Sequence, residues 1–195
     1  PLRRGSRHGS SSAARPSRPT SAGALARTLG STKTPKAMSL QKIHMVRALS
    51  GPLTPEPASS ELRVMSSEDI TQLGRLFLDA YIGTVDYEGE SEQDALAAVQ
   101  GAFDGEFGNF LSSASYVAQR AGELCSASFV TLWQGKPLLA FSVTAARHKG
   151  SGLAGRCISA SMQALYQAGQ PELHLFVSPG NFPAMAVYKR LGFKA

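Results

Sequence analysis

The chain has 195 residues, which is enough for one domain of ordinary size with a buried core. Its formal net charge is +6, but positions 1–60 hold ten Lys and Arg side chains and one acid, Glu56, whereas positions 61–195 hold ten basic and thirteen acidic side chains. The second part is therefore mildly acidic, which argues against a nucleic-acid-binding core. No window approaches eighteen apolar residues, so no membrane partner or membrane span is predicted.

Residues 1–60 are rich in Ser, Arg, Ala, Pro and Gly and show little apolar periodicity. A segment of this composition cannot bury enough apolar surface to offset its ordering entropy, so it is predicted to be a largely disordered basic arm. Its bias also fits an organelle transit peptide, with a short amphipathic turn or two over residues 38–49, or an upstream leader. Binding of nucleic acid by the arm is disfavoured because positions 1–60 contain no Phe, Trp or Tyr.

The segment from residue 61 predicts alternating helices and strands. A short strand over residues 62–65 is followed by Ser66 and Asp69, which are spaced as a helix-start box, and by a helix that ends near Gly83. An acidic loop then precedes a second helix around residues 96–103. Five carboxylates lie between this loop and the helix start: Asp86, Glu88, Glu90, Glu92 and Asp94.

Three strands are predicted next, around residues 115–120, 124–133 and 137–144, as an antiparallel meander. The third is nearly continuous in apolar residues, as expected for a central strand covered on both faces. A helix over residues 153–169, a buried strand over 173–177 and a last helix that opens with Asn181 and Pro183 follow. The fold class is therefore mixed α/β, with helices packed on a central sheet.

Two cysteines, Cys125 and Cys157, each lie in an apolar stretch. This pattern indicates buried thiols in a reducing compartment rather than a disulfide or a metal site. We expect an intracellular, cytoplasmic protein without a metal, or one of an organelle matrix if the arm is a transit peptide.

A glycine-containing turn joins the strand ending at Thr144 to the following helix. Gly150 and Gly152 leave backbone N–H groups open at the positive end of the helix dipole, and Arg147 and Lys149 add positive charge beside them. Such a turn can bind an anion such as a diphosphate. Alone it is a weak signal, because many strand-to-helix connections contain Gly-x-Gly.

The turn and the last helix together resemble the GNAT superfamily of acetyl-CoA-dependent N-acetyltransferases. The turn fits the family's Arg/Gln-x-x-Gly-x-Gly/Ala motif with Arg147, Gly150 and Gly152, or, in the preferred register, with Lys149, Gly152 and Ala154; Ala146 stands where the family often has Pro. A second block matches the family's Asn-x-x-Ala-x-x-Leu-Tyr and Gly-Phe, with Val187 in the Leu place. Its residues are Asn181, Ala184, Tyr188, Gly192 and Phe193.

The resemblance implies a central, mostly antiparallel sheet flanked by helices and splayed at the cofactor cleft between the strands near Thr144 and Val177. It also implies that acetyl-CoA is the co-substrate and that the pantetheine arm pairs with the free edge of the strand ending at Thr144. The implied cofactor-binding residues are Ser142, Val143, Thr144, Lys149, Gly150, Ser151, Gly152, Leu153, Ala154, Asn181 and Tyr188.

Acetyl transfer from a thioester needs a neutral amine, a polarised carbonyl and a proton for the departing thiolate. The resemblance makes Tyr188 the catalytic general acid and a backbone N–H near Val143 the polarising group; Tyr188 as a core tyrosine is the alternative. The base is not identified by the sequence, and Glu123, Glu172 and His174 are candidates by position. The acidic loop is either part of the acceptor site, where it attracts a cationic amine, or an ordinary solvated loop.

The family fold continues past its Gly-Phe with further strands beside the strand at Val177, whereas this sequence stops at Ala195. We therefore expect residues 61–195 to form a GNAT domain without its final strands, with an exposed sheet edge. Either a partner chain, for example in a homodimer, covers that edge, or the sequence is a fragment.

The sequence favours an N-acetyltransferase that moves the acetyl group of acetyl-CoA to a primary amine of a small molecule or a peptide. The alternative is a non-catalytic GNAT-like binding or regulatory module.

Overall fold

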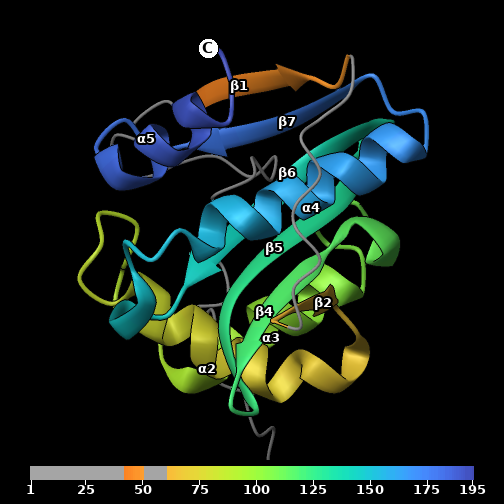
Figure 1. Cartoon of the computed structure of the whole chain (residues 1–195). Coiled ribbons are helices and arrows are strands. Elements are labelled where there is room, and N and C mark those ends of the chain that lie inside the picture. Colours follow the sequence, from red (N-terminus) through yellow and green to blue (C-terminus); the bar gives the residue numbers. More distant parts are fainter. Residues whose placement is uncertain (1–41, 51–60) are drawn as a thin grey trace, which may run out of the picture.

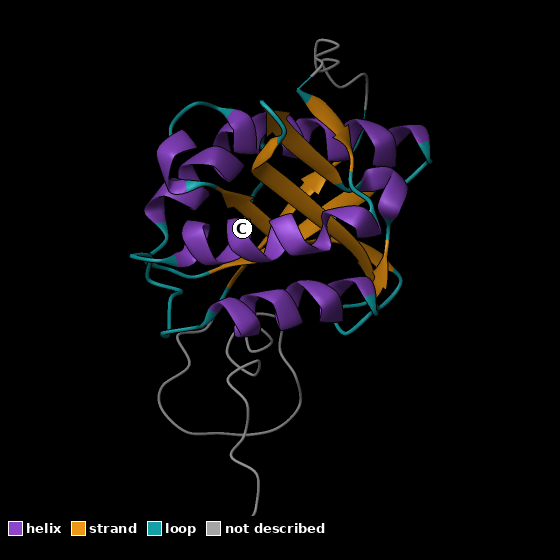
Figure 2. Cartoon of the chain, turned by 90° about the horizontal axis from the view of Figure 1, so that it is seen from below, coloured by secondary structure: helices purple, strands orange, loops and turns teal. Residues whose placement is uncertain are grey.

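The computed structural model describes residues 42–50 and 61–195, which form a seven-stranded sheet with helices on both faces (Figures 1 and 2). The strand order is β1-β7-β6-β5-β4-β2, with β3 paired to β5, and all neighbours are antiparallel except β6 and β7. The predicted mixed fold with a mostly antiparallel sheet is therefore confirmed. The strands are β1 (Ile43–Ala48), β2 (Leu62–Val64), β3 (Asn109–Phe110), β4 (Tyr116–Arg120), β5 (Glu123–Trp133), β6 (Lys136–Thr144) and β7 (Glu172–Val177).

Helices α2 (Ile70–Tyr81) and α3 (Glu92–Phe103) cover one face of the sheet, and α4 (Leu153–Gln167) and α5 (Phe182–Arg190) cover the other. A cluster of aromatic rings, Phe77, Phe129 and Phe141 among them, fills the first layer, with Phe77 and Phe129 fully buried. On the second face, leucines of β7 pack against Ile158 and Met162 of α4. The described residues also contain three short 3-10 helices: Ser67–Asp69, Ser112–Ala114 and Ala146–His148.

Strand β1 corrects two sequence-based expectations. Residues 43–48 belong to the predicted disordered arm, in which the sequence allows a short amphipathic turn or two, but they form a strand paired antiparallel to all of β7, from Ile43 opposite Val177 to Ala48 opposite Glu172 (orange in Figure 1). The sheet edge beside β7, predicted to be exposed, is thus covered from within the chain. The predicted start of the folded part at residue 61 is therefore wrong for this stretch. Residues 1–41 and 51–60 of the predicted arm lie outside the described residues.

Strands β6 and β7 run parallel but pair at two positions only, Leu138 with His174 and Leu139 with Leu175. Ala140 has no partner in β5, since Phe129 faces Phe141 and Val130 faces Leu139, so β6 carries a bulge at the point where it leaves β7. A bulge bends its strand and raises the local twist. The two strands therefore diverge towards their carboxyl ends (Figure 1), as the predicted splay requires.

The start of the first long helix is fixed by Asp69, which is 4% exposed. Its carboxylate accepts hydrogen bonds from Arg63 Nη1 and Nη2, at 2.8 and 2.6 Å, and from the Ser66 backbone N–H at 2.9 Å, so the predicted helix-start box is confirmed. Burial raises the pKa of Asp69, but the hydrogen bonds from Arg63 and Ser66 outweigh it, and the pKa lies below its ordinary value.

Replacing Asp69 with Asn is expected to lower the free energy of unfolding by about 1.5–3 kcal/mol at pH 7, the range for hydrogen bonds to a charged group. Since the pKa is depressed by folding, this contribution is complete above the unfolded-state pKa and is lost as the pH falls through the folded-state value. Urea unfolding at pH 7 and pH 2.5 checks both points. Glu92→Gln, which breaks the exposed Arg75 pair, is the control and should cost below about 0.5 kcal/mol.

Both cysteines are buried, as predicted. Among residues 42–50 and 61–195, no helix has the length and apolar character needed to cross a lipid bilayer.

Candidate functional site

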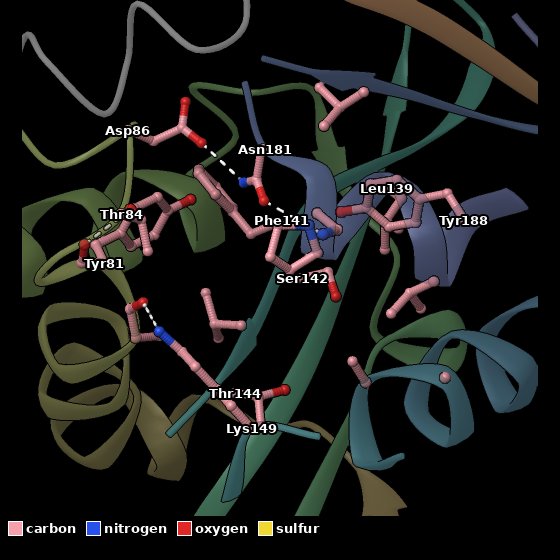
Figure 3. A pocket seen from close by; sticks show the side chains of 18 of the residues that line it. Tyr81, Thr84, Asp86, Leu139, Phe141, Ser142, Thr144, Lys149, Asn181 and Tyr188 are labelled. Carbon is pink, nitrogen blue, oxygen red and sulfur yellow. Dashed lines mark hydrogen bonds between the residues drawn. The ribbon is translucent and has the colours of Figure 1, made fainter. Parts of the chain in front are cut away.

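A cavity of about 390 Å³ opens where β6 and β7 diverge (Figure 3). Its walls come from the second half of β6, the turn before α4, the end of β7 and the first turns of α5, with the end of α2 opposite. Of the eleven residues predicted to bind the cofactor, the cavity is lined by all except Ser151, whose hydroxyl donates to the His148 carbonyl at 2.5 Å. The cavity therefore gathers residues from two sequence blocks predicted to act together.

The amino end of α4 presents a set of open backbone donors to the cavity. Gly150 and Gly152 adopt φ values of +80° and +83°, which favour glycine, and space is open where a Cβ would project. Within the described residues, the N–H groups of Gly150, Gly152, Leu153 and Ala154 make no backbone hydrogen bond, whereas those of Lys149 and Ser151 donate to the Ala146 and His148 carbonyls. Of the amides of residues 149–154, which the sequence predicts to bind an anion, those of Lys149 and Ser151 are therefore already used within the chain.

Arg147 and Lys149, which the sequence places as cations beside these open amides, have other partners in the structure. Lys149 Nζ donates to the Ala80 carbonyl at 2.9 Å, at the carboxyl end of α2, and so ties the turn to that helix. Arg147 pairs with Glu123 and does not line the cavity. Instead Arg190, which lines the cavity from the end of α5, brings Nη2 to 3.4 Å from the point where a Cβ on Gly155 would lie. Arg190 therefore supplies positive charge at the first turn of α4.

The free edge of β6 offers hydrogen-bonding groups to a ligand in the splay. Ala145 N–H donates to the Cys125 carbonyl on β5 at 2.9 Å, and backbone groups of successive residues in an antiparallel strand alternate in direction. Val143 therefore faces β5, whereas Ser142 and Thr144 direct their N–H and carbonyl groups into the gap on the β7 side. The backbone N–H groups next to Val143 that face the gap are therefore those of Ser142 and Thr144.

Tyr188 is 8% exposed and lies against Phe193, with ring centroids 5.9 Å apart. Burial raises the pKa of Tyr188 to about 12, the Ser142 side chain lowers it in part, and the charge of Asp86 raises it. The phenol therefore keeps its proton at neutral pH. It lines the same cavity as the free edge of β6.

Asp86 joins three segments at the mouth of the cavity. Its carboxylate accepts hydrogen bonds from Asn181 Nδ2 at 3.0 Å, from the Ser178 hydroxyl and from Lys42 Nζ at 3.1 Å, and Figure 3 shows Asp86 and Asn181 directed at each other. Asn181 also caps α5 by accepting from Ala184 N–H at 3.2 Å. Burial raises the pKa of Asp86, but the Ser178 hydrogen bond and the Lys42 charge outweigh it, so the pKa is lowered and the group is ionised at neutral pH.

Of the five carboxylates in the acidic segment, Asp86 is the one that lines the cavity. Glu90 accepts from the Glu88 backbone N–H, Glu92 pairs with Arg75, and Asp94 closes a capping box with Ser91. If the acidic segment contributes to an acceptor site in this cavity, Asp86 is therefore its contributing carboxylate.

The three base candidates taken from position lie outside the cavity lining. Glu123 pairs with Arg147, and Glu172 accepts from Lys136 at 3.1 Å. His174 is 6% exposed and hydrogen-bonded to Glu172 at 2.8 Å and to His44 at 2.9 Å. All three side chains therefore interact with neighbours outside the cavity lining.

Sequence reasoning missed several cavity residues, because each comes from an element whose place depends on the sheet. Lys42 lay in the predicted arm, and Tyr81, Phe176 and Ser178 carry no motif. Asp86 had one signal, its place in the acidic segment, and Arg190 had one, its position directly after the Tyr188-Lys189 pair of the second block.

Comparison with known proteins agrees with this geometry. Residues 127–195, from the middle of β5 onwards, match the family described as FR47-like protein. No curated protein matches the chain in a sequence comparison.

Solved structures share the fold at low identity. A GCN5-related N-acetyltransferase from Sphaerobacter thermophilus superposes with a TM-score of 0.61 and 15% identity, over 79% of this chain and 48% of that one. The ribosomal-protein-S18-alanine N-acetyltransferase of Escherichia coli gives 0.54 and 16%, over 68% and 76%, and the PaiA N-acetyltransferase of Thermoplasma acidophilum in complex with coenzyme A gives 0.54 and 18%, over 69% and 89%. The chain thus spans about half the length of the first of these.

Proposed function

Because the chain has the fold of the GNAT N-acetyltransferases and its last third matches the FR47-like family, we propose that it transfers the acetyl group of acetyl-CoA to a primary amine. The observation that carries the proposal is the single cavity in which open amides at the start of α4, the free edge of β6 and the protonated Tyr188 meet.

In this proposal the N–H groups of Gly150, Gly152, Leu153 and Ala154 bind the diphosphate of the coenzyme, with Arg190 beside them. The pantetheine arm lies in the splay and bonds the free edge of β6, as an added strand does. This arrangement brings the thioester to the part of the cavity that Ser142 and Tyr188 line.

The chemistry follows from the groups at that point. The Ser142 or Thr144 amide polarises the thioester carbonyl, the neutral amine attacks its carbon, and the C–S bond breaks as Tyr188 gives its proton to the sulfur. The acceptor ammonium loses one proton before it attacks, and its nitrogen loses a second after the C–N bond has formed. Asp86, the ionised carboxylate within the described cavity lining, passes these protons to solvent. We propose a small molecule or a peptide as the acceptor.

Titration calorimetry with acetyl-CoA tests the cofactor half of the proposal. Ala154→Asp puts a negative charge beside the expected diphosphate and is expected to weaken binding at least ~30-fold through like-charge repulsion. An acid in the first turn is favourable for the helix itself, so the fold should persist.

The matched control is Ala160→Asp, which puts the same charge about 9 Å further along α4 and should change affinity less than ~3-fold. Absence of binding by the unaltered chain, at millimolar acetyl-CoA, contradicts the proposal. Binding without acetyl transfer to any of a panel of primary amines supports the non-catalytic alternative.

A further inference from the structure

Lys42 places a primary ammonium group at the cavity. Its Nζ donates to Ser178 Oγ at 2.7 Å and to Asp86 Oδ1 at 3.1 Å, across 136 and 44 positions of sequence. The side chain is 24% exposed and that of Asp86 15% exposed, so the pair is largely shielded from water. Lys42 is also part of the cavity lining, together with Tyr188 and Ser142.

The Asp86 carboxylate, which binds the Lys42 ammonium, is itself held in place by other residues. Asp86 is oriented by Ser178 and by Asn181 Nδ2 at 3.0 Å, and Asn181 is itself fixed as the cap of α5. The loop that carries Asp86 is docked on the β7–α5 connection, where Val85 Cγ1 lies 3.5 Å from the point of a Cβ on Gly180. A preorganised carboxylate with a neighbouring hydroxyl suits any alkylammonium ion, whether or not it belongs to the chain.

Lys42 is held near this group by its backbone. The next residue, Ile43, is the first of β1 and pairs with Val177 at the end of β7. A tethered group of this kind acts at an effective concentration of about millimolar or more. The Lys42 side chain is flexible, however, and it is partly exposed. Its ammonium group can therefore leave Asp86 and move into solvent.

We propose that Asp86 and Ser178 form the subsite for the ammonium group of the acceptor, and that Lys42 occupies this subsite as a tethered competitor. The inference rests on the proposed function and adds to it a substrate class, an unhindered primary alkylammonium, and a built-in inhibition. An acceptor must displace Lys42 before its own nitrogen takes that position.

Steady-state acetylation of butylamine, whose chain matches a lysine side chain, tests this directly. Lys42→Met keeps the stem and removes the ammonium, and it is expected to lower the KM for butylamine about tenfold or more with the KM for acetyl-CoA unchanged. Lys42→Arg keeps a cation and should stay within about threefold of the unaltered chain. Asp86→Asn should raise the KM for butylamine about tenfold.

Lys136→Met is the matched control, because it removes an ammonium that pairs with Glu172 outside the cavity lining. An unchanged butylamine KM in Lys42→Met, or an equal fall in Lys136→Met, overturns the inference: the Lys42–Asp86 pair is then a structural ion pair only. Circular dichroism and thermal unfolding of each variant separate such effects from loss of fold.

A binding measurement separates failure of the inference from failure of the proposed function. Butylammonium chloride is titrated into protein labelled with carbon-13 at the carboxyl groups, and the Asp86 resonance is followed. The inference expects a saturable shift in Lys42→Met at concentrations at least tenfold below those needed in the unaltered chain, even if no acetyl transfer occurs. Equal responses in the two proteins refute it independently of any activity.

Discussion

Replacing Tyr188 with Phe is expected to lower kcat for acetyl transfer by about 10²–10³-fold, within the range for loss of a general acid. The phenol is buried and protonated at neutral pH, so the substitution removes the proton donor with little change in packing. Affinity for acetyl-CoA should change less than about threefold. Stopped reactions with a fixed amine, together with calorimetry, give both quantities.

Tyr166→Phe serves as the control, since Tyr166 is exposed on the last turn of α4, and it should leave kcat unchanged. The pH profile is a second readout. Because the pKa of Tyr188 is raised to about 12, the acid keeps its proton below that pH, and the rate should rise as the amine is deprotonated, without a descending limb up to about pH 11. A kcat in Tyr188→Phe within threefold of the unaltered chain would falsify the assignment.

Replacing Met45 with Ala is expected to lower the free energy of unfolding by about 2–4 kcal/mol, as for other truncations of buried methionines. Met45 is 2% exposed, lies opposite Leu175 of β7, and belongs to the cluster under α4 and α5. Loss of its side chain leaves a cavity between β1 and the rest of that cluster. Urea unfolding measures the effect.

Val46→Thr is the control for Met45, because Val46 is only partly buried and points to the opposite face of β1. It should cost less than about 1 kcal/mol. If Met45→Ala costs no more than Val46→Thr, then β1 contributes little to the fold in solution, and the correction of the sheet edge is wrong.

Local sequence was enough to predict the α-helices, and the strands longer than two residues, from residue 61 onwards. The helix-start box at Ser66 and Asp69, the glycines before α4 and the apolar run of β6 each express their structure within a few residues. Strand β1 escaped prediction because its buried face consists of Ile43 and Met45 before Arg47 interrupts the pattern. Two apolar positions in a basic segment do not distinguish a strand from a coil.

Some residues of the candidate site could be predicted from the sequence, and others could not. The donors before α4 and the pair Asn181 and Tyr188 carry a family motif, so their grouping could be predicted from their order and spacing. In the sequence, nothing distinguishes Asp86 from the other carboxylates of the acidic segment, or Lys42 from the other cations of the arm. Their meeting depends on the docking of a loop and of β1 against the end of β7.

The sequence by itself determined which segments from residue 61 onwards become the α-helices and the longer strands, and where backbone amides are left open before α4, because those properties depend on neighbours within one or two turns of chain. Only the tertiary structure decided which strand covers the edge of β7, which backbone groups of β6 face the gap, and which carboxylate and ammonium meet at its mouth. These outcomes depend on strand register and on contacts across tens of residues, which local pattern does not encode.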